Sequence, residues 1–199
     1  MRNIKNKIVK KLTGKRDGYA WFAGVYFVFF ALLIVIAVLD YYMIGLTKDK
    51  VEDALTSSSL GSLIYDKEEY ALSKSYILLN TDTNYQTLKK LVGDNLGLTN
   101  QNGNEFSGKN SYITADTTHC KLVTAIFYNK YSNGVIKSYK YDGNSPKQTF
   151  TDYMDDTYTP LGDKVVETSV FVIFEYPTNF FWKEVKVRAA SYVALTDGY

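Results

Sequence analysis

The most constraining feature of this sequence is an uncharged apolar run near the amino terminus. Residues 19–39 read YAWFAGVYFVFFALLIVIAVL, 21 consecutive residues without Asp, Glu, Lys or Arg. As an α-helix they would extend about 30 Å, the thickness of the hydrocarbon core of a bilayer. Tyr19 and Trp21 lie at one end and Tyr41 and Tyr42 follow the other, as aromatic residues do at membrane interfaces. A buried helix of a soluble protein rarely stays uncharged for this length, so the run predicts a transmembrane helix.

Charge is distributed unevenly around this run. Residues 1–18 carry seven Lys or Arg against Asp17 alone, a net charge of +6, whereas the rest of the chain carries 16 basic and 20 acidic residues, a net charge of −4. The positive-inside rule places the tail in the cytoplasm and the remainder outside the cell membrane. The basic tail is suited to contact with anionic membrane lipid. A mildly acidic outer part does not indicate a nucleic-acid partner, which would require a basic face.

A cleaved secretory signal is the main alternative to a retained anchor. Its apolar region would span 7–15 residues and end in a small-x-small site. Here the run is longer and continues into Asp40-Tyr41-Tyr42. We therefore expect a basic cytoplasmic tail or leader at residues 1–18, a transmembrane helix at 19–39 and an exocytoplasmic domain at 40–199. With Cys120 as the only cysteine, this domain cannot form an internal disulfide.

The helix is expected to continue beyond the membrane. Apolar and small residues recur at spacings of three and four after residue 40, without an intervening proline. These residues are Met43, Ile44, Thr47, Val51, Ala54, Leu55 and Ser58. The pattern predicts one helix from Tyr19 to about Leu60. Its outer half would pack Val51 and Leu55 against another element.

Two further segments have helical and irregular patterns. A second helical region is expected at residues 66–96, with a cap at Thr81-Asp82-Thr83 ahead of a stripe of leucine and valine. Residues 99–110 are polar and contain glycine, which indicates an exposed loop. Residues 142–164 are rich in turn-forming and acidic residues.

The remaining segments favour β-strands. Asn133-Gly134 separates two of them and is a strong hairpin signal, because both central residues of a type I′ turn need positive φ. The sequence predicts a turn at Pro177-Thr178-Asn179 between the last two. The four expected strands are 121–129, 135–141, 165–176 and 185–195. We expect an α+β fold, in which the long helix covers one face of a small antiparallel sheet.

Residues capable of chemistry are sparse. His119 and Cys120 are the only His and Cys. Adjacent strand residues point to opposite faces, so the two would not form a nucleophilic pair, and zinc sites need three or four such ligands. Asp152, Asp155 and Asp156 lack the spacing of a calcium-binding EF-hand loop and indicate a solvated turn.

Paired carboxylates are not expected either. Glu167 and Glu175 fall eight residues apart in one predicted strand, which is over 25 Å in an extended chain. No glycine-rich phosphate loop or serine elbow occurs in the sequence. We therefore predict no catalytic residue, cofactor or metal site, and a protein that is not an enzyme.

The overall arrangement resembles a known family. A basic leader, a glycine, an uncharged helix that continues outward and a small β domain resemble bacterial type IV pilin-like proteins. Within these, the stretch KRDGYAWFAGVYFVFFALLIVIAVLDYYMIGLTKDKVEDAL and, more loosely, VKVRAASYVAL are most similar to TadE-like minor pilins or pseudopilins of the tight-adherence pilus system in Gram-positive bacteria. The resemblance implies a cell-surface role in pilus assembly, with other pilin-like subunits and pilus assembly proteins as partners.

The resemblance also implies particular site residues. Cleavage by a prepilin peptidase would fall between Gly18 and Tyr19. Many family members carry a glutamate five residues after the cut, where this chain has Ala23. This departure favours cleavage without incorporation as a major polymer subunit. Ala20 and Gly24, four residues apart, provide a small-residue surface for contact between helices.

Two other classes of function stay open from the sequence. One is a membrane-anchored extracellular module that binds a cell-wall polymer or a partner protein, for which the 18 tyrosines would provide aromatic contacts. The other is an exocytoplasmic enzyme, which would need titratable groups gathered around His119.

Overall fold

The computed structural model describes residues 2–101, 103–109, 113–143 and 147–196, and the side-chain surroundings of these residues except 2–18, 109 and 114–118. The chain divides into two units, Met1–Met43 and Ile44–Tyr199. Helix α1 (Arg2–Ser62) contributes to both units.

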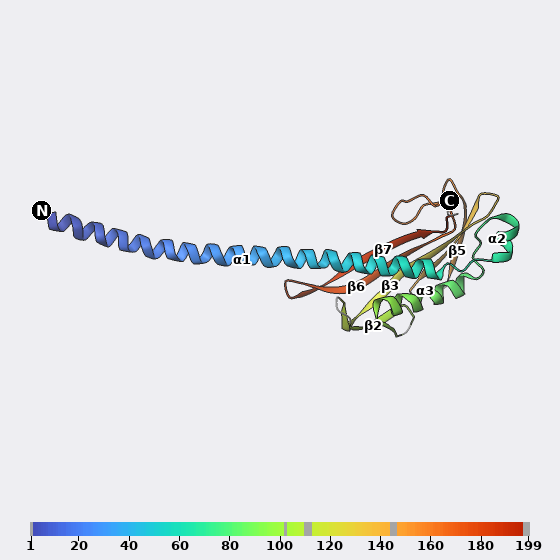
Figure 1. The fold of residues 1–199 in the computed structure, drawn as a ribbon, viewed down its shortest axis with the longest axis horizontal. Coiled ribbons are helices and arrows are strands. Elements are labelled where there is room, and N and C mark those ends of the chain that lie inside the picture. Colours follow the sequence, from blue (N-terminus) through green and yellow to red (C-terminus); the bar gives the residue numbers. More distant parts are fainter. Residues whose placement is uncertain (1, 102, 110–112, 144–146, 197–199) are drawn as a thin grey trace. The chain divides into compact units, whose positions relative to one another are not determined.

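The first unit contains the amino-terminal part of α1, blue in Figure 1. Its side chains from Tyr19 onward are mostly exposed, including large apolar ones such as Phe27, which is 74% exposed. The helix from Tyr19 to Ser62 is long and apolar enough to cross a membrane, although an amino-terminal signal sequence would meet the same criterion.

In the second unit, α1 buries one face over residues 44–62. The buried positions recur at helical spacing, as predicted, and are Thr47, Val51, Leu55, Ser58, Ser59 and Ser62. The Ser58 hydroxyl donates to the Ala54 carbonyl at 2.7 Å. It also accepts from Asn95 Nδ2 at 2.9 Å, which ties α1 to the next long helix. The predicted end near Leu60 is close to the observed end at Ser62. Met43, which we placed on this face, is instead exposed, because burial begins one turn later.

The predicted helical region 66–96 forms two helices, α2 (Lys67–Ser73) and α3 (Thr81–Leu96). Lys74 adopts a left-handed conformation with φ 56° and ends α2. The Asn80 side chain accepts hydrogen bonds from the backbone N–H groups of Asp82 and Thr83. Asn80 is therefore the N-cap, one residue before the cap that we predicted.

In the part of the chain that the structure describes, seven strands follow, all paired antiparallel. They are β1 (Thr99–Asn100), β2 (Glu105–Lys109), β3 (Thr114–Lys130), β4 (Val135–Asp142), β5 (Gln148–Tyr153), β6 (Ser169–Phe180) and β7 (Lys183–Ala194). The long strand β3 pairs with β2 and β4 along successive parts of one edge and with β6 along the other. Strand β7 pairs with β6 along its whole length.

The sheet differs from the predicted four strands in two places. The expected loop 99–110 contains β1 and β2, and the turn-rich segment 142–164 contains β5. All side chains of β5 are exposed, so no alternation of apolar and polar residues marks it in the sequence.

The hairpin turns follow the prediction in one case only. The β3–β4 hairpin turns at Asn133-Gly134, the predicted place, but only Gly134 has a positive φ, 78°. Because Asn133 does not, the turn is not the type I′ turn that the sequence predicted. The turn predicted at residues 177–179 is wrong, because Pro177 pairs with Lys186 inside the β6–β7 ladder. The pairing of β6 with β3 extends only to Glu175, so β6 is an edge strand at Pro177, where the missing N–H is tolerated.

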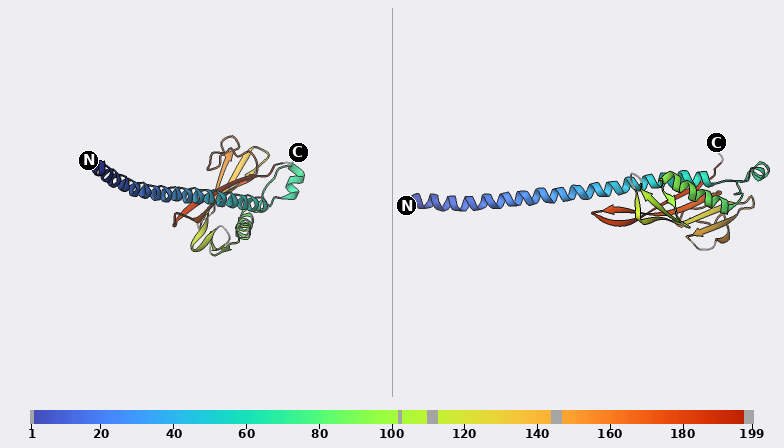
Figure 2. Two further views of the ribbon diagram at one scale, coloured as in Figure 1. Left: turned by 60° about the vertical axis from the view of Figure 1, so that its left-hand side comes forward. Right: turned by 90° about the horizontal axis from the view of Figure 1, so that it is seen from below.

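The main core lies between the sheet and the two long helices. Val51 and Leu55 of α1 belong to one cluster with Leu88 of α3 and with Val172 and Phe174 of β6. Figure 2 shows α1 and α3 against the same face of the sheet. A smaller cluster around Phe171 covers part of the other face. The α+β fold class is confirmed, with a long helix packed on an antiparallel sheet.

Burial of ionisable groups in this core leads to a pH prediction. Burial raises the pKa of Tyr85, Tyr176 and Cys120 to about 12 in each case. In the unfolded chain these groups lose their protons near pH 8.5–10, before they do in the folded domain. Their contribution to the free energy of unfolding is therefore fully present below that range. We expect its stability to fall as pH rises from about 9 towards 12. The urea concentration that halves the β-sheet circular dichroism signal should therefore fall across this pH range. A constant midpoint would contradict the burial of these groups.

Candidate functional site

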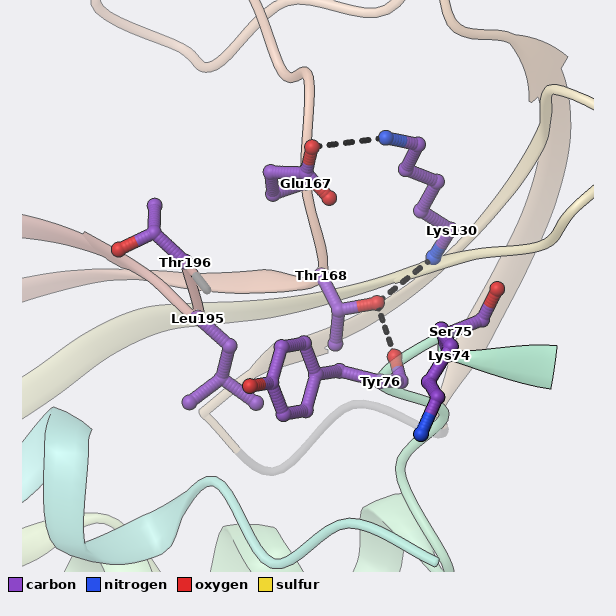
Figure 3. A pocket seen from close by; sticks show the side chains of 8 residues that line it. All are labelled: Lys74, Ser75, Tyr76, Lys130, Glu167, Thr168, Leu195 and Thr196. Atoms are coloured by element: carbon purple, nitrogen blue, oxygen red, sulfur yellow. Dashed lines mark hydrogen bonds and ion pairs between the residues drawn. The ribbon is translucent and has the colours of Figure 1, made fainter. Parts of the chain in front are cut away.

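A pocket of about 320 Å³ that is lined by several polar groups is a candidate site (Figure 3). It lies at the end of the sheet where β3 ends and β6 begins. The lining residues are Lys74, Ser75, Tyr76, Lys130, Glu167, Thr168, Leu195 and Thr196. They come from four segments of the chain, which the antiparallel pairing brings to one place.

A hydrogen-bond network holds the pocket together. The Thr168 hydroxyl donates to the Tyr76 carbonyl and accepts from the Lys130 backbone N–H at 3.0 Å. The Lys130 ammonium lies 2.8 Å from the Glu167 carboxylate, as the dashed line in Figure 3 shows. The connection between α2 and α3 is therefore fixed to the ends of two core strands.

Tyrosine side chains adjoin this pocket. Tyr65, Tyr70 and Tyr76 contact one another, with Tyr70 and Tyr76 stacked at a centroid separation of 4.6 Å. The Lys74 ammonium lies 5.5 Å from the centre of the Tyr70 ring. Aromatic faces, hydroxyls and two ammonium groups are suited to binding a polar ligand. The pocket lining contains no histidine, cysteine or paired carboxylates that would act as a nucleophile and base.

His119 and Cys120 lie on opposite faces of β3. His119 is exposed, whereas Cys120 is fully buried in the main core. Burial raises the pKa of the Cys120 thiol to about 12, which keeps it protonated at neutral pH. The pair is not a nucleophile with its base.

The acidic residues are also separated. Asp152, Asp155 and Asp156 are exposed, and Lys164 pairs with Asp155 at 2.8 Å and lowers the pKa of that carboxyl group. Within the part of the chain that the structure describes, no group of three or more His, Cys, Asp or Glu is placed to hold a metal ion.

The carboxylates that we placed on one strand fall in different elements. Glu167 precedes β6 and pairs with Lys130, while Glu175 lies inside β6 and accepts from Arg188 Nε at 2.9 Å. The prediction that both belong to one strand is wrong, because the Val165–Thr168 segment runs into the sheet without pairing as part of β6.

The candidate residues along α1 lie in different units: those implied by the family resemblance are in the first and those predicted from helical spacing are in the second. Gly18 is in α1, but the surroundings of its side-chain position lie outside what the structure describes. Tyr19 and Ala20 are exposed, and a Cβ placed on Gly24 would meet nothing within 4 Å. By contrast, Val51 and Leu55 are fully buried within the second unit.

Comparisons with known proteins do not extend these observations. No family model matches the sequence, no curated protein matches it, and no solved structure matches the fold.

Sequence reasoning missed the pocket entirely. Its residues are ordinary types spread over positions 74–76, 130, 167–168 and 195–196, and only the strand pairing brings them together. No local motif could have identified it. A second missed feature is the aromatic run Phe180-Phe181-Trp182, which is visible in the sequence but follows the predicted turn at residues 177–179.

Proposed function

We propose that this protein is a pilin-like minor subunit or pseudopilin, anchored in the cell membrane, that takes part in assembly of a bacterial surface pilus or secretion system. The observation that supports this most is the division of α1. Residues 44–62 bury one stripe in the α+β domain, whereas residues 19–43 are largely apolar on every side and exposed. An apolar helix with no core of its own requires lipid or other helices around it.

In this proposal the protein acts by packing. Related apolar helices would associate in the membrane, and the outer domains would set the geometry of the assembly. Ala20 and Gly24 would allow close approach of a neighbouring helix, because small residues let backbones come together. With Ala23 at the position where a glutamate is common, the span contains no carboxylate that needs a partner in lipid.

Removal of the basic leader tests the proposal. Seven cations at the helix end would hold the chain at the inner surface, so a subunit that leaves the bilayer must lose them. We expect cleavage after Gly18, with an intact mass that lacks residues 1–18 for protein isolated from native membranes. Gly18→Val should abolish the shortened species, and Gly14→Val serves as the matched control that leaves it unchanged.

A full-length species beginning at Met1 or Arg2 would contradict a processed pilin-like subunit. It would favour the second candidate, a membrane-anchored extracellular binding module for a cell-wall polymer or partner protein. The pocket beside Tyr70 and Tyr76 supports that candidate, since aromatic faces bind sugars and peptides.

A further inference from the structure

The β6–β7 hairpin ends in three consecutive aromatic residues. Phe180 pairs with Lys183, so Phe181 and Trp182 form the two-residue turn. The rings of Phe180 and Phe181 lie 4.9 Å apart and those of Phe181 and Trp182 lie 6.2 Å apart. Trp182 is 85% exposed, the highest value among the large apolar side chains that the structure describes in the second unit. We call residues 180–182 the aromatic tip.

The backbone of the aromatic tip is unfavourable for these residues. Phe181 and Trp182 have φ of 47° and 61°, the left-handed conformation that a type I′ turn requires at both positions. Asn and Gly adopt it readily and bulky residues do not. The β3–β4 hairpin of the same domain has a glycine, Gly134, at its positive-φ position. Two large aromatics at the strained positions, with one almost fully exposed, indicate a role other than folding.

The aromatic tip lies at the end of the domain where the chain joins the apolar helix. Thr56 of α1 contacts Ser191 of β7 at 2.9 Å between hydroxyl oxygens. Nearer the turn, Tyr176 of β6 is close enough to Glu52 and Asp49 of α1 that, together with burial, their carboxylates raise its pKa. The hairpin therefore runs towards its turn in the same direction as α1 runs back towards Ile44. Figure 1 shows the β6–β7 hairpin projecting beyond the other strands.

Chain lengths give the reach of the hairpin. From Ser191 to Trp182 is about 30 Å of strand, and from Thr56 back to Ile44 is about 18 Å of helix. The difference is about 12 Å, so the hairpin extends beyond Ile44, the residue at which the second unit begins.

We propose that the aromatic tip inserts into the outer headgroup region of the same membrane that holds the anchor. Tryptophan and phenylalanine partition into this region, where an apolar ring leaves water without entering the hydrocarbon centre. The contact gives the domain a second attachment beside its helix and restricts its rotation on the membrane. The inference rests on the membrane anchor of the proposed function.

Charge has a minor part in this contact. Lys186 and Arg188 both pair with Glu175, at 3.4 Å and 2.9 Å, and Glu184 follows Lys183 directly at the turn. The region therefore has little net charge with which to attract anionic lipid. We expect the contact to persist at high salt and in bilayers of neutral lipid, unlike binding through a basic patch.

The two tryptophans of the chain make the test specific. Full-length Trp21→Phe retains Trp182 alone, and full-length Trp182→Phe retains Trp21 alone. Each is reconstituted in phosphatidylcholine nanodiscs with and without brominated lipid. Trp182 should lose fluorescence with brominated lipid and be protected from aqueous acrylamide. If Trp21 is quenched by the lipid but Trp182 is not, the anchor stands and this inference fails. If neither is quenched, both fail.

A second variant separates membrane contact from packing. Phe181→Asn with Trp182→Gly places a favoured type I′ pair in the turn. Labelling of the buried Cys120 thiol in urea should then require equal or higher urea than in the wild type. A domain that exposes Cys120 at lower urea would show that the aromatic tip serves to hold the fold, which would overturn the inference.

Discussion

Replacing Val51 by Asp is expected to destabilise the outer domain by about 3–5 kcal/mol, because it leaves an unpaired charge in the core. Val51 is fully buried and belongs to the cluster that joins α1 to the sheet. Leu55→Ala, one turn later, creates a cavity in the same cluster and should cost about 2–5 kcal/mol. The two variants remove the same packing by different means.

Cys120 provides the measurement. It is the only cysteine and is fully buried, so a thiol reagent labels it only when the domain opens. The full chain in nanodiscs is titrated with urea and the labelled fraction is determined by mass. Val51→Asp should shift the labelling midpoint to much lower urea or abolish protection altogether.

Ser57→Asp is the matched control, since Ser57 is exposed on the same helix. It adds the same charge in the same helical segment and should change stability by no more than about 0.5 kcal/mol. An unchanged midpoint for Val51→Asp would show that α1 does not pack on the sheet.

The helix and its buried face could be predicted because both depend on patterns in neighbouring residues. An uncharged run marks residues 19–39 of α1, and spacings of three and four mark Val51 and Leu55 further along the helix. Met43 was misplaced because periodicity gives a face but not the position where packing begins. That position depends on where the sheet lies.

Two of the strands that were not predicted have no apolar pattern in the sequence. Strand β5 is fully exposed and β1 has two residues, so neither has an apolar pattern. Pro177 misled the placement of the last turn, since proline marks turns in most contexts. It is accommodated here because β6 has lost its β3 neighbour at that point. A local pattern does not show which strand edge is unpaired.

The candidate sites also differ in how far the sequence alone could identify them. The residues at the start of the apolar helix, Gly18 to Gly24, follow one another in the chain and could be named from sequence. The pocket around Lys130 and Thr168 depends on long-range strand pairing and could not. The aromatic tip is three consecutive aromatic residues in the sequence. Only the pairing of β6 with β7 shows that these residues form an exposed turn.

The orientation of the chain in the membrane is expected to be complete and uniform. Seven basic residues precede the apolar run and Asp40 follows it, so the amino terminus should stay in the cytoplasm in every copy. Replacing the basic residues of 1–18 by serine removes this bias, and a substantial fraction of inverted molecules should appear. Replacing the same number of exposed lysines in the outer domain should have no such effect.

The most direct test of this account is protease digestion of intact protoplasts that express the chain with a different epitope tag at each end. The carboxyl-terminal tag should be lost from intact protoplasts, while the amino-terminal tag should survive until the membrane is opened by detergent. Survival of the carboxyl-terminal tag in intact protoplasts would place the α+β domain inside the cell and contradict an anchored exocytoplasmic domain.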